Sequence, residues 1–119
     1  MDQKTLVAVV SLTKELIGAS TCSAETKEAA QRWLDTVDTP SLKEETQKYI
    51  AELEEDIMPI DNLIAFAESQ QGQAYFGSDT AAGIAAHGKE IRKAGAKYCD
   101  CPACAAAEKI LALKDALLA

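Results

Sequence analysis

The side chains with the most distinctive chemistry are three cysteines in the segment Cys99-Asp100-Cys101-Pro102-Ala103-Cys104. Proline is common at the first position of a helix, so this motif predicts that Cys101 caps a helix and that Cys104 lies in its first turn. The exposed amides and the positive dipole end of a helix lower the pKa of a thiol placed there and favour the thiolate. Thiolates are the form that binds metal ions and that takes part in disulfide exchange.

A fourth cysteine would complete a metal site. Tetrahedral zinc takes four thiolates, and the four cysteines of the chain are Cys22, Cys99, Cys101 and Cys104. An iron–sulfur cluster is the lesser metal interpretation, because the spacing matches none of the common ferredoxin motifs. His87 is the single histidine and could serve as the fourth ligand in place of Cys22, although a lone histidine in a helix is more often a surface or packing residue.

Two other interpretations of the cysteines stay open. The turn Cys101-Pro102-Ala103-Cys104 looks like the active-site turn of glutaredoxins, which implies a thiol/disulfide redox protein that uses Cys101 and Cys104. Glutaredoxins place this turn after a strand, whereas this sequence predicts no strands, so we do not transfer their activity. In the third interpretation the cysteines stay reduced and bind nothing.

The remaining sequence lacks the residues of the common catalytic sites. A single histidine excludes sites that are built on two or three histidines, and the glycines do not form a phosphate-binding loop. We therefore expect no enzymatic activity. If the protein is an enzyme, it is a thiol-disulfide oxidoreductase.

Helices must position the cysteines. Apolar residues recur at spacings of three and four along the chain, and β-branched residues show no alternation, which predicts an all-α fold. Asp2, Ser23, Asp61 and a capping box of Ser41 with Glu44 are the predicted N-terminal caps. The predicted helices are 3–17, 23 to just before Thr39-Pro40, 41–57, 61–70, 78–94 and 101 onward, with a loop at 71–77.

Pro59 decides the number of helices. If it only kinks one long helix, the chain has five helices, and the loops that carry Cys22 and Cys99 fall at opposite ends of an antiparallel bundle. If the chain reverses there, it has six helices and these loops share an end. The break at Pro59 followed by Asp61 as a cap favours reversal, and the four-cysteine zinc site depends on it.

The size and composition indicate one domain. A chain of 119 residues has room for a single domain over 1–119, which we expect to be a compact bundle of five or six antiparallel helices. Alanine is so frequent that the core is thin, and a bound metal would add stability to it.

The charge pattern restricts the partners. A net charge of −7 repels phosphate groups, which excludes non-specific nucleic-acid binding and attraction to anionic lipid. Acidic residues predominate over 41–61 and basic residues over 89–97, which we interpret as complementary faces of two neighbouring helices. No 18-residue stretch is free of charge and the N-terminal residues lack a signal-peptide pattern, so we expect a cytosolic protein with no membrane span. A protein partner and the oligomeric state stay open.

Two segments carry a family resemblance. Residues 49–67 and 94–104 read YIAELEEDIMPIDNLIAFA and AGAKYCDCPAC, and they resemble a family of short, all-helical, uncharacterised bacterial proteins. Its members often carry an automatic label as heat-shock chaperones of the ninety-kilodalton class. A helical chain of 119 residues has no room for an ATP-binding chaperone domain, so the resemblance supports the cysteine motif and implies no catalytic residue.

Together these observations predict a small cytosolic module for metal binding, with structural zinc or an iron–sulfur cluster, or for protein interaction. The first alternative is a thiol redox protein. A chaperone-like or stress-associated interaction protein is the lesser alternative.

Overall fold

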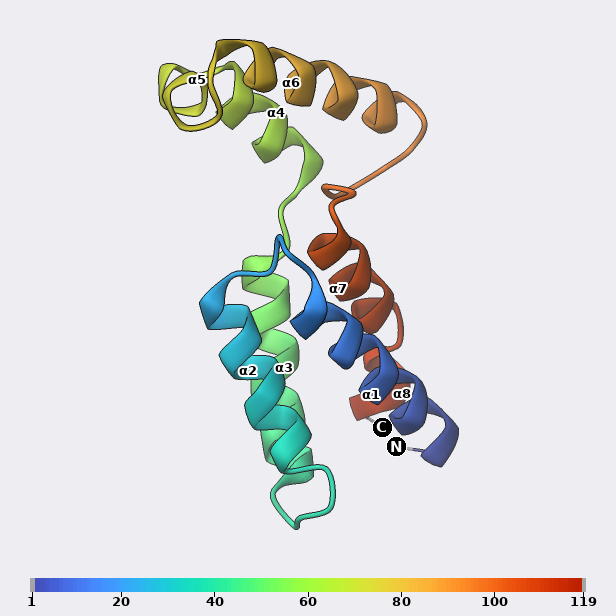
Figure 1. Ribbon diagram of the computed structural model, residues 1–119. Coiled ribbons are helices and arrows are strands. Elements are labelled where there is room, and N and C mark those ends of the chain that lie inside the picture. Colours follow the sequence, from blue (N-terminus) through green and yellow to red (C-terminus); the bar gives the residue numbers. More distant parts are fainter. Residues whose placement is uncertain (1, 119) are drawn as a thin grey trace. The chain divides into compact units, whose positions relative to one another are not determined.

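The computed structural model describes residues 2–118, which form helices and one isolated β-bridge, so the all-α prediction is confirmed (Figure 1). The described residues contain eight helices where the sequence predicted five or six. They are α1 (Gln3–Gly18), α2 (Ala24–Asp35), α3 (Leu42–Asp56), α4 (Ile60–Glu68), α5 (Gln70–Phe76), α6 (Ser78–Lys93), α7 (Pro102–Ala112) and α8 (Lys114–Leu118).

The two additional helices are α5 and α8. The expected loop over 71–77 is wrong, because α5 occupies most of it. Ser69 caps this helix, and its hydroxyl accepts the N–H of Gly72 at 3.0 Å. Gly72 is buried so tightly that a Cβ atom there would collide with the carbonyl group of Phe66. The expected last helix is interrupted at Leu113, where α7 ends and α8 follows.

The N-terminal caps follow the sequence prediction in part. Asp2 accepts the N–H of Thr5, and Ser23 accepts the N–H of Thr26, as predicted. The predicted capping box of Ser41 is wrong, because Ser41 has helical dihedrals and makes no cap hydrogen bond. Asp61 is also wrong as a cap, since α4 begins one residue earlier with Pro59 in the cap position.

The described residues divide into two compact units (Figure 1). The first unit lies within Met1–Ile57 and Asp100–Ala119 and contains α1, α2, α3, α7 and α8, and the second is Met58–Cys99 with α4, α5 and α6. The expectation of a single domain over 1–119 stays a prediction, since two compact units need not fold independently.

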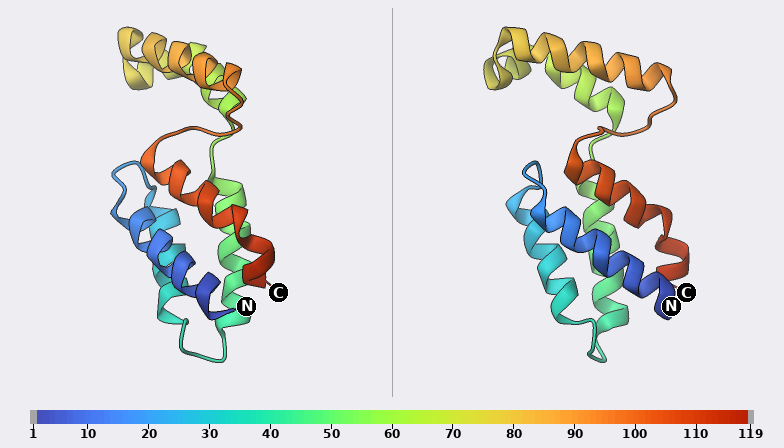
Figure 2. Two further views of the ribbon diagram at one scale, coloured as in Figure 1. Left: turned by 90° about the vertical axis from the view of Figure 1, so that its right-hand side faces the viewer. Right: turned by 45° about the vertical axis from the view of Figure 1, so that its right-hand side comes forward.

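The first unit is built on antiparallel neighbours. Helix α1 packs against α2 and α7, and α2 packs against α3, as both views in Figure 2 show. The C-terminal ends of α1 and α3 and the N-terminal ends of α2 and α7 line one pocket, so these four helices alternate in direction. This end of the first unit carries most of the cysteines.

An aromatic pair forms the centre of the first unit. The rings of Trp33 and Tyr49 stack with centroids 5.2 Å apart, and both side chains are buried. Trp33 Nε1 donates to Thr46 Oγ1 at 2.8 Å, and the Tyr49 hydroxyl shares a 2.9 Å hydrogen bond with Thr13 Oγ1. Each polar group of the pair therefore has a partner, which allows both rings to be buried without an unsatisfied donor.

The Tyr49 hydroxyl predicts a loss of stability at alkaline pH. Burial raises its pKa to about 12, because the phenolate would lose its hydration in the core, whereas an unfolded tyrosine titrates near pH 10. The resulting stabilisation of about 2–3 kcal/mol is present below pH 10 and is lost as the pH rises from 10 through 12. Urea unfolding followed between pH 8 and 12 measures this loss.

The control is Tyr49→Phe, which keeps the ring and removes the titrating group. At neutral pH this variant should be less stable by about 1 kcal/mol, because the Thr13 hydroxyl loses its partner. Its stability should then fall less than that of the wild type between pH 10 and 12. Parallel pH profiles for the two proteins would contradict the assignment.

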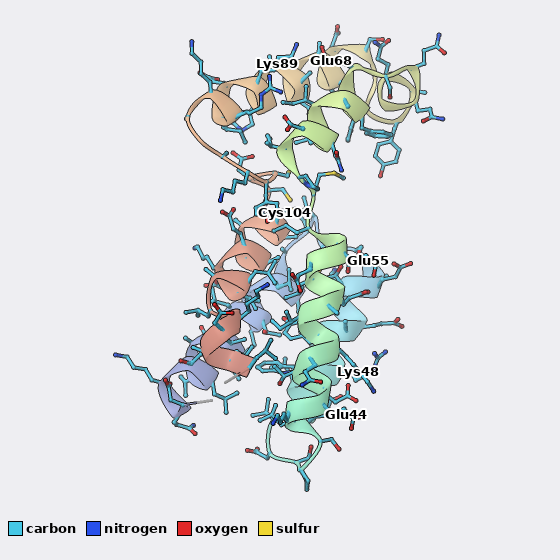
Figure 3. The ribbon with its side chains drawn as sticks, turned by 180° about the vertical axis from the view of Figure 1, so that it is seen from behind. Glu44, Lys48, Glu55, Glu68, Lys89 and Cys104 are labelled. Carbon is cyan, nitrogen blue, oxygen red and sulfur yellow. The ribbon has the colours of Figure 1, made fainter. Side chains whose placement is uncertain are left out.

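The second unit packs α4 and α5 against α6. A Cβ atom at the buried Gly88 would approach Ile64 Cγ1 to 2.8 Å, so glycine permits the close approach of α4 and α6. Ion pairs of 2.9 Å join Lys89 to Glu68, labelled in Figure 3, and Arg92 to Asp61. The Arg92 pair joins the basic stretch 89–97 to one residue of the acidic stretch 41–61, whereas Glu54 of the acidic stretch pairs with Lys114. The predicted match of two helix faces stays a prediction.

Backbone hydrogen bonds join the first and the last residues of the second unit in a short extended pairing. Pro59 and Tyr98 form the isolated antiparallel bridge, Ile60 N–H donates to the Lys97 carbonyl at 2.9 Å, and Cys99 N–H donates to the Met58 carbonyl at 2.8 Å. Pro59 therefore ends one helix and starts another instead of kinking a continuous one.

None of the described helices combines the length and apolar character that crossing a membrane requires.

Candidate metal centre

The sulfur atoms of Cys99, Cys101 and Cys104 all lie within 4.8 Å of one another. Each of these side chains is partly buried. All three belong to six consecutive residues, so the local course of the chain sets their spacing. Thiolates are soft donors that suit zinc, copper(I) and iron–sulfur clusters, and this group is therefore the candidate metal centre.

The start of α7 places two of the three sulfurs. Cys101 has extended dihedrals and occupies the N-terminal cap, Pro102 follows at the first helical position, and the Cys101 sulfur accepts the N–H of Cys104 at 3.4 Å. This confirms the cap predicted from the sequence. The hydrogen bond directs the Cys101 sulfur toward the first turn, where Cys104 lies (labelled in Figure 3).

Cys99 reaches the group from an extended segment. Its backbone N–H is bonded to the Met58 carbonyl, one residue beyond the bridge between Pro59 and Tyr98. The backbone at Cys99 is thus held by hydrogen bonds on one side of Asp100, and the Cys101 backbone is held by the helix cap on the other. Cys99 and Cys101 are only two residues apart, so these two restraints keep the three sulfurs close together.

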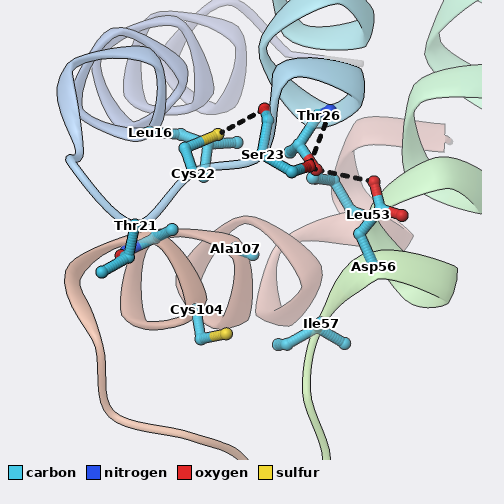
Figure 4. Close-up of a pocket in the computed structure, with 11 residues that line it drawn as sticks. Leu16, Thr21, Cys22, Ser23, Thr26, Leu53, Asp56, Ile57, Cys104 and Ala107 are labelled. Atoms are coloured by element: carbon cyan, nitrogen blue, oxygen red, sulfur yellow. Dashed lines mark hydrogen bonds between the residues drawn. The ribbon is translucent and has the colours of Figure 1, made fainter. Parts of the chain in front are cut away.

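Cys22 is not a member of this group of sulfurs. It lies in the loop between α1 and α2 and is only 8% exposed, and its thiol donates to the Ser23 carbonyl at 3.6 Å (Figure 4). Burial raises the pKa of this thiol, because the thiolate loses hydration. Of the four cysteines that the sequence proposed as ligands, the structure therefore brings three together.

The Cys22 loop nevertheless lies at the same end of the first unit as the start of α7. The Thr21 hydroxyl accepts the N–H of Ala103 at 3.1 Å, and Cys22 and Cys104 line the same pocket (Figure 4). The end of α3 and the start of α7 both line that pocket, so the two segments share an end of the first unit, as the reversal alternative requires. Because α4 belongs to the second unit, reversal of the chain at Pro59 itself stays a prediction. Cys22 is thus at the end of the first unit that its role as a ligand requires.

His87 lies in α6 and is exposed. Its ring nitrogens do not belong to a group of converging ligand atoms among the described residues. Its role as a substitute fourth ligand stays a prediction.

A group of carboxylates was not proposed as a ligand set from the sequence. Oxygen atoms of Glu25, Glu52 and Asp56 lie within 4.8 Å of one another, with Glu52 and Asp56 one turn apart on α3. Desolvation and the neighbouring Asp56 raise the pKa of Glu52, and Asp56 also accepts a 2.7 Å hydrogen bond from the Thr26 hydroxyl. The spacing on α3 was visible in the sequence, but the approach of Glu25 depends on the packing of α2. Exposed acidic groups often gather without an ion, so we assign no site here.

Comparison with protein-family models, with curated proteins and with solved structures finds no match to this chain. The geometry of the cysteines is therefore the observation from which a function can be inferred.

Proposed function

We propose that this chain is a small metal-binding protein whose ligands are Cys99, Cys101 and Cys104, with Cys22 as the fourth thiolate of a zinc site. The convergence of three sulfurs within 4.8 Å is the observation that carries this proposal. Three thiolates at such distances repel one another, and a bound cation removes that repulsion. An iron–sulfur cluster is the lesser candidate for the same sulfurs.

The surroundings of Cys22 support its role as the fourth ligand. The hydrogen bond between Thr21 and Ala103 ties the Cys22 loop to the first turn of α7, and residues of both segments line one pocket. The Cys22 thiol now donates a 3.6 Å hydrogen bond to the Ser23 carbonyl. Such a bond is weak, so little hydrogen-bond energy is lost when the Cys22 sulfur binds a metal instead.

The proposed role of the metal is structural. A zinc ion bound in this way links the α1–α2 loop to the beginning of α7, two segments far apart in the sequence, and its binding free energy becomes folding free energy. A site closed by four protein ligands has no open position for a substrate, so we propose a protein without enzymatic activity. A reducing compartment such as the cytosol keeps the thiols available for the metal.

Elemental analysis of anaerobically purified protein tests the proposal. We expect about one zinc ion per chain, as a four-thiolate site requires. In Cys22→Ser, which leaves three thiolates, zinc should still bind but at least tenfold more weakly in competition with a chelator. Protein that stays metal-free after incubation with zinc under reducing conditions would contradict the proposal.

A thiol redox protein is the second candidate. The observation in its favour is the position of Cys101 and Cys104 at the first turn of α7, with the Cys101 sulfur bonded to the Cys104 N–H. Metal-free protein with a readily reduced disulfide between Cys101 and Cys104 would support this function. Four titratable thiols with neither metal nor disulfide would instead favour an interaction module that acts through a protein partner.

A further inference from the structure

We infer that the metal site is a redox switch: hydrogen peroxide converts Cys101 and Cys104 into a disulfide, and the site then releases its metal. This inference rests on the proposed function, because it describes how the same site is regulated.

The distances bring the reacting atoms close together. The sulfurs of Cys101 and Cys104 already lie within 4.8 Å, and a disulfide requires about 2.05 Å. Cys101 caps α7 and Cys104 lies in its first turn. Rotation about the two χ1 angles therefore brings the sulfurs together, and no helix has to move. A single turn of helix thus holds both a metal ligand pair and a disulfide pair.

The other sulfurs are less suitable partners. Cys99 is separated from Cys101 by one residue, and its backbone is tied to Met58 by a 2.8 Å hydrogen bond, so a disulfide between them closes a small ring on a restrained segment. Cys22 is buried, and its thiol points to the Ser23 carbonyl. The two-residue spacing of Cys101 and Cys104 is the one that exchanging dithiols use.

Access by the oxidant also favours Cys101 and Cys104 over Cys22. Cys101 and Cys104 are partly exposed, whereas Cys22 is 8% exposed. Oxidation of thiols follows exposure and thiolate character, and thiolates are the form in which a metal site holds its cysteines. A molecule as small as hydrogen peroxide therefore reaches the sulfurs of Cys101 and Cys104 before it reaches the buried Cys22.

The chemical step balances with hydrogen peroxide as the oxidant. One ligand sulfur attacks a peroxide oxygen, the O–O bond breaks, and the leaving hydroxide takes up a proton to become water, which leaves a sulfenic acid. The second sulfur attacks the sulfenic sulfur, the S–O bond breaks, and the departing hydroxide takes up another proton. Two thiolates, one peroxide and two protons thus give one disulfide and two waters, with two electrons transferred from sulfur to oxygen.

Loss of the metal follows from the ligand count. A disulfide between Cys101 and Cys104 removes two of the four proposed thiolates, and Cys99 and Cys22 alone do not complete a tetrahedral zinc site. A dithiol reductant restores the two thiols and with them the site. Zinc occupancy of the protein thus reports the oxidation state of one cysteine pair.

The experiment uses the full chain loaded with zinc, with its zinc content measured first. One equivalent of hydrogen peroxide per chain is added, released zinc is followed with a chromophoric chelator, and disulfides are located by peptide mass mapping. We expect about one zinc released per chain, a disulfide between Cys101 and Cys104, and recovery of zinc binding after treatment with dithiothreitol and zinc.

The outcomes separate the inference from the proposed function. A chain that binds no zinc before peroxide is added overturns both. A chain that binds zinc but keeps it in peroxide, or that forms a disulfide through Cys99 or Cys22, overturns the redox switch and leaves the metal site standing.

A matched pair of metal-free variants checks the pairing. Peroxide should leave a sulfenic acid on Cys101 in Cys104→Ser, trapped by a 1,3-dione reagent, because the second sulfur is missing. Metal-free Cys99→Ser should still form the disulfide between Cys101 and Cys104. A stable sulfenic acid in Cys99→Ser would show that Cys99 supplies the second sulfur and would refute the assigned pair.

Discussion

Cys104→Ser should abolish zinc binding, because only two of the three converging sulfurs remain, whereas Cys22→Ser keeps all three. The midpoint of thermal unfolding of Cys104→Ser should fall by about 10 °C or more relative to the zinc-loaded wild type. A ligand present at 100 to 1,000 times its Kd stabilises the folded state by about 2.7–4.1 kcal/mol, and all of this is lost with the site. For a chain of this size, each kcal/mol corresponds to several degrees in the midpoint. Differential scanning calorimetry with and without zinc measures the effect.

Two comparisons make this result specific. Wild-type protein in excess chelator should melt near the temperature of Cys104→Ser, because both lack the metal. Ala105→Ser is the matched variant, since it places a hydroxyl on the next residue of the same turn and removes no sulfur, and it should bind zinc normally. Zinc binding by Cys104→Ser, or the same melting temperature as zinc-loaded wild type, would reject the metal centre.

The second large effect is expected at the core of the first unit. Trp33→Ala should lower the free energy of unfolding by about 3–5 kcal/mol, as for other large-to-small substitutions of buried aromatic residues. The indole is 1% exposed and stacks on Tyr49 at 5.2 Å, so its removal leaves a cavity beside the second ring of the pair. Urea unfolding followed by circular dichroism measures the loss.

Trp33→Phe separates packing from hydrogen bonding. The smaller ring retains most of the contact with Tyr49 and loses the N–H bond to Thr46, whose hydroxyl still donates to the Leu42 carbonyl at 2.6 Å. This variant should lose about 1–2 kcal/mol, clearly less than the alanine variant. Equal losses in both variants would show that the indole hydrogen bond dominates and that the stacked pair contributes little.

Several helix ends could be predicted because their causes are local. Asp2, Ser23 and Cys101 each accept an N–H three residues ahead, and the chain around each residue is enough to form that bond. The break at Pro59 is of the same kind, since proline restricts its own backbone and that of the residue before it.

Other elements could not be predicted, because packing decides them. Residues 70–76 contain glutamines and a glycine that favour a loop, yet they form α5, because Gly72 fits closely against the carbonyl of Phe66 on α4. Ser41 has the sequence of a capping box, but its backbone is already helical, so its side chain cannot cap α3. In both places a tertiary contact or the preceding turn overrides the local preference.

The candidate site divides in the same way. The sequence alone determined that Cys99, Cys101 and Cys104 would gather at the start of a helix, because all three lie within six residues and a proline begins that helix. Only the tertiary structure decided where Cys22 lies relative to them. Its position depends on α1, α2, α3 and α7 alternating in direction so that their ends meet at one pocket, and that arrangement comes from contacts between residues far apart in the chain.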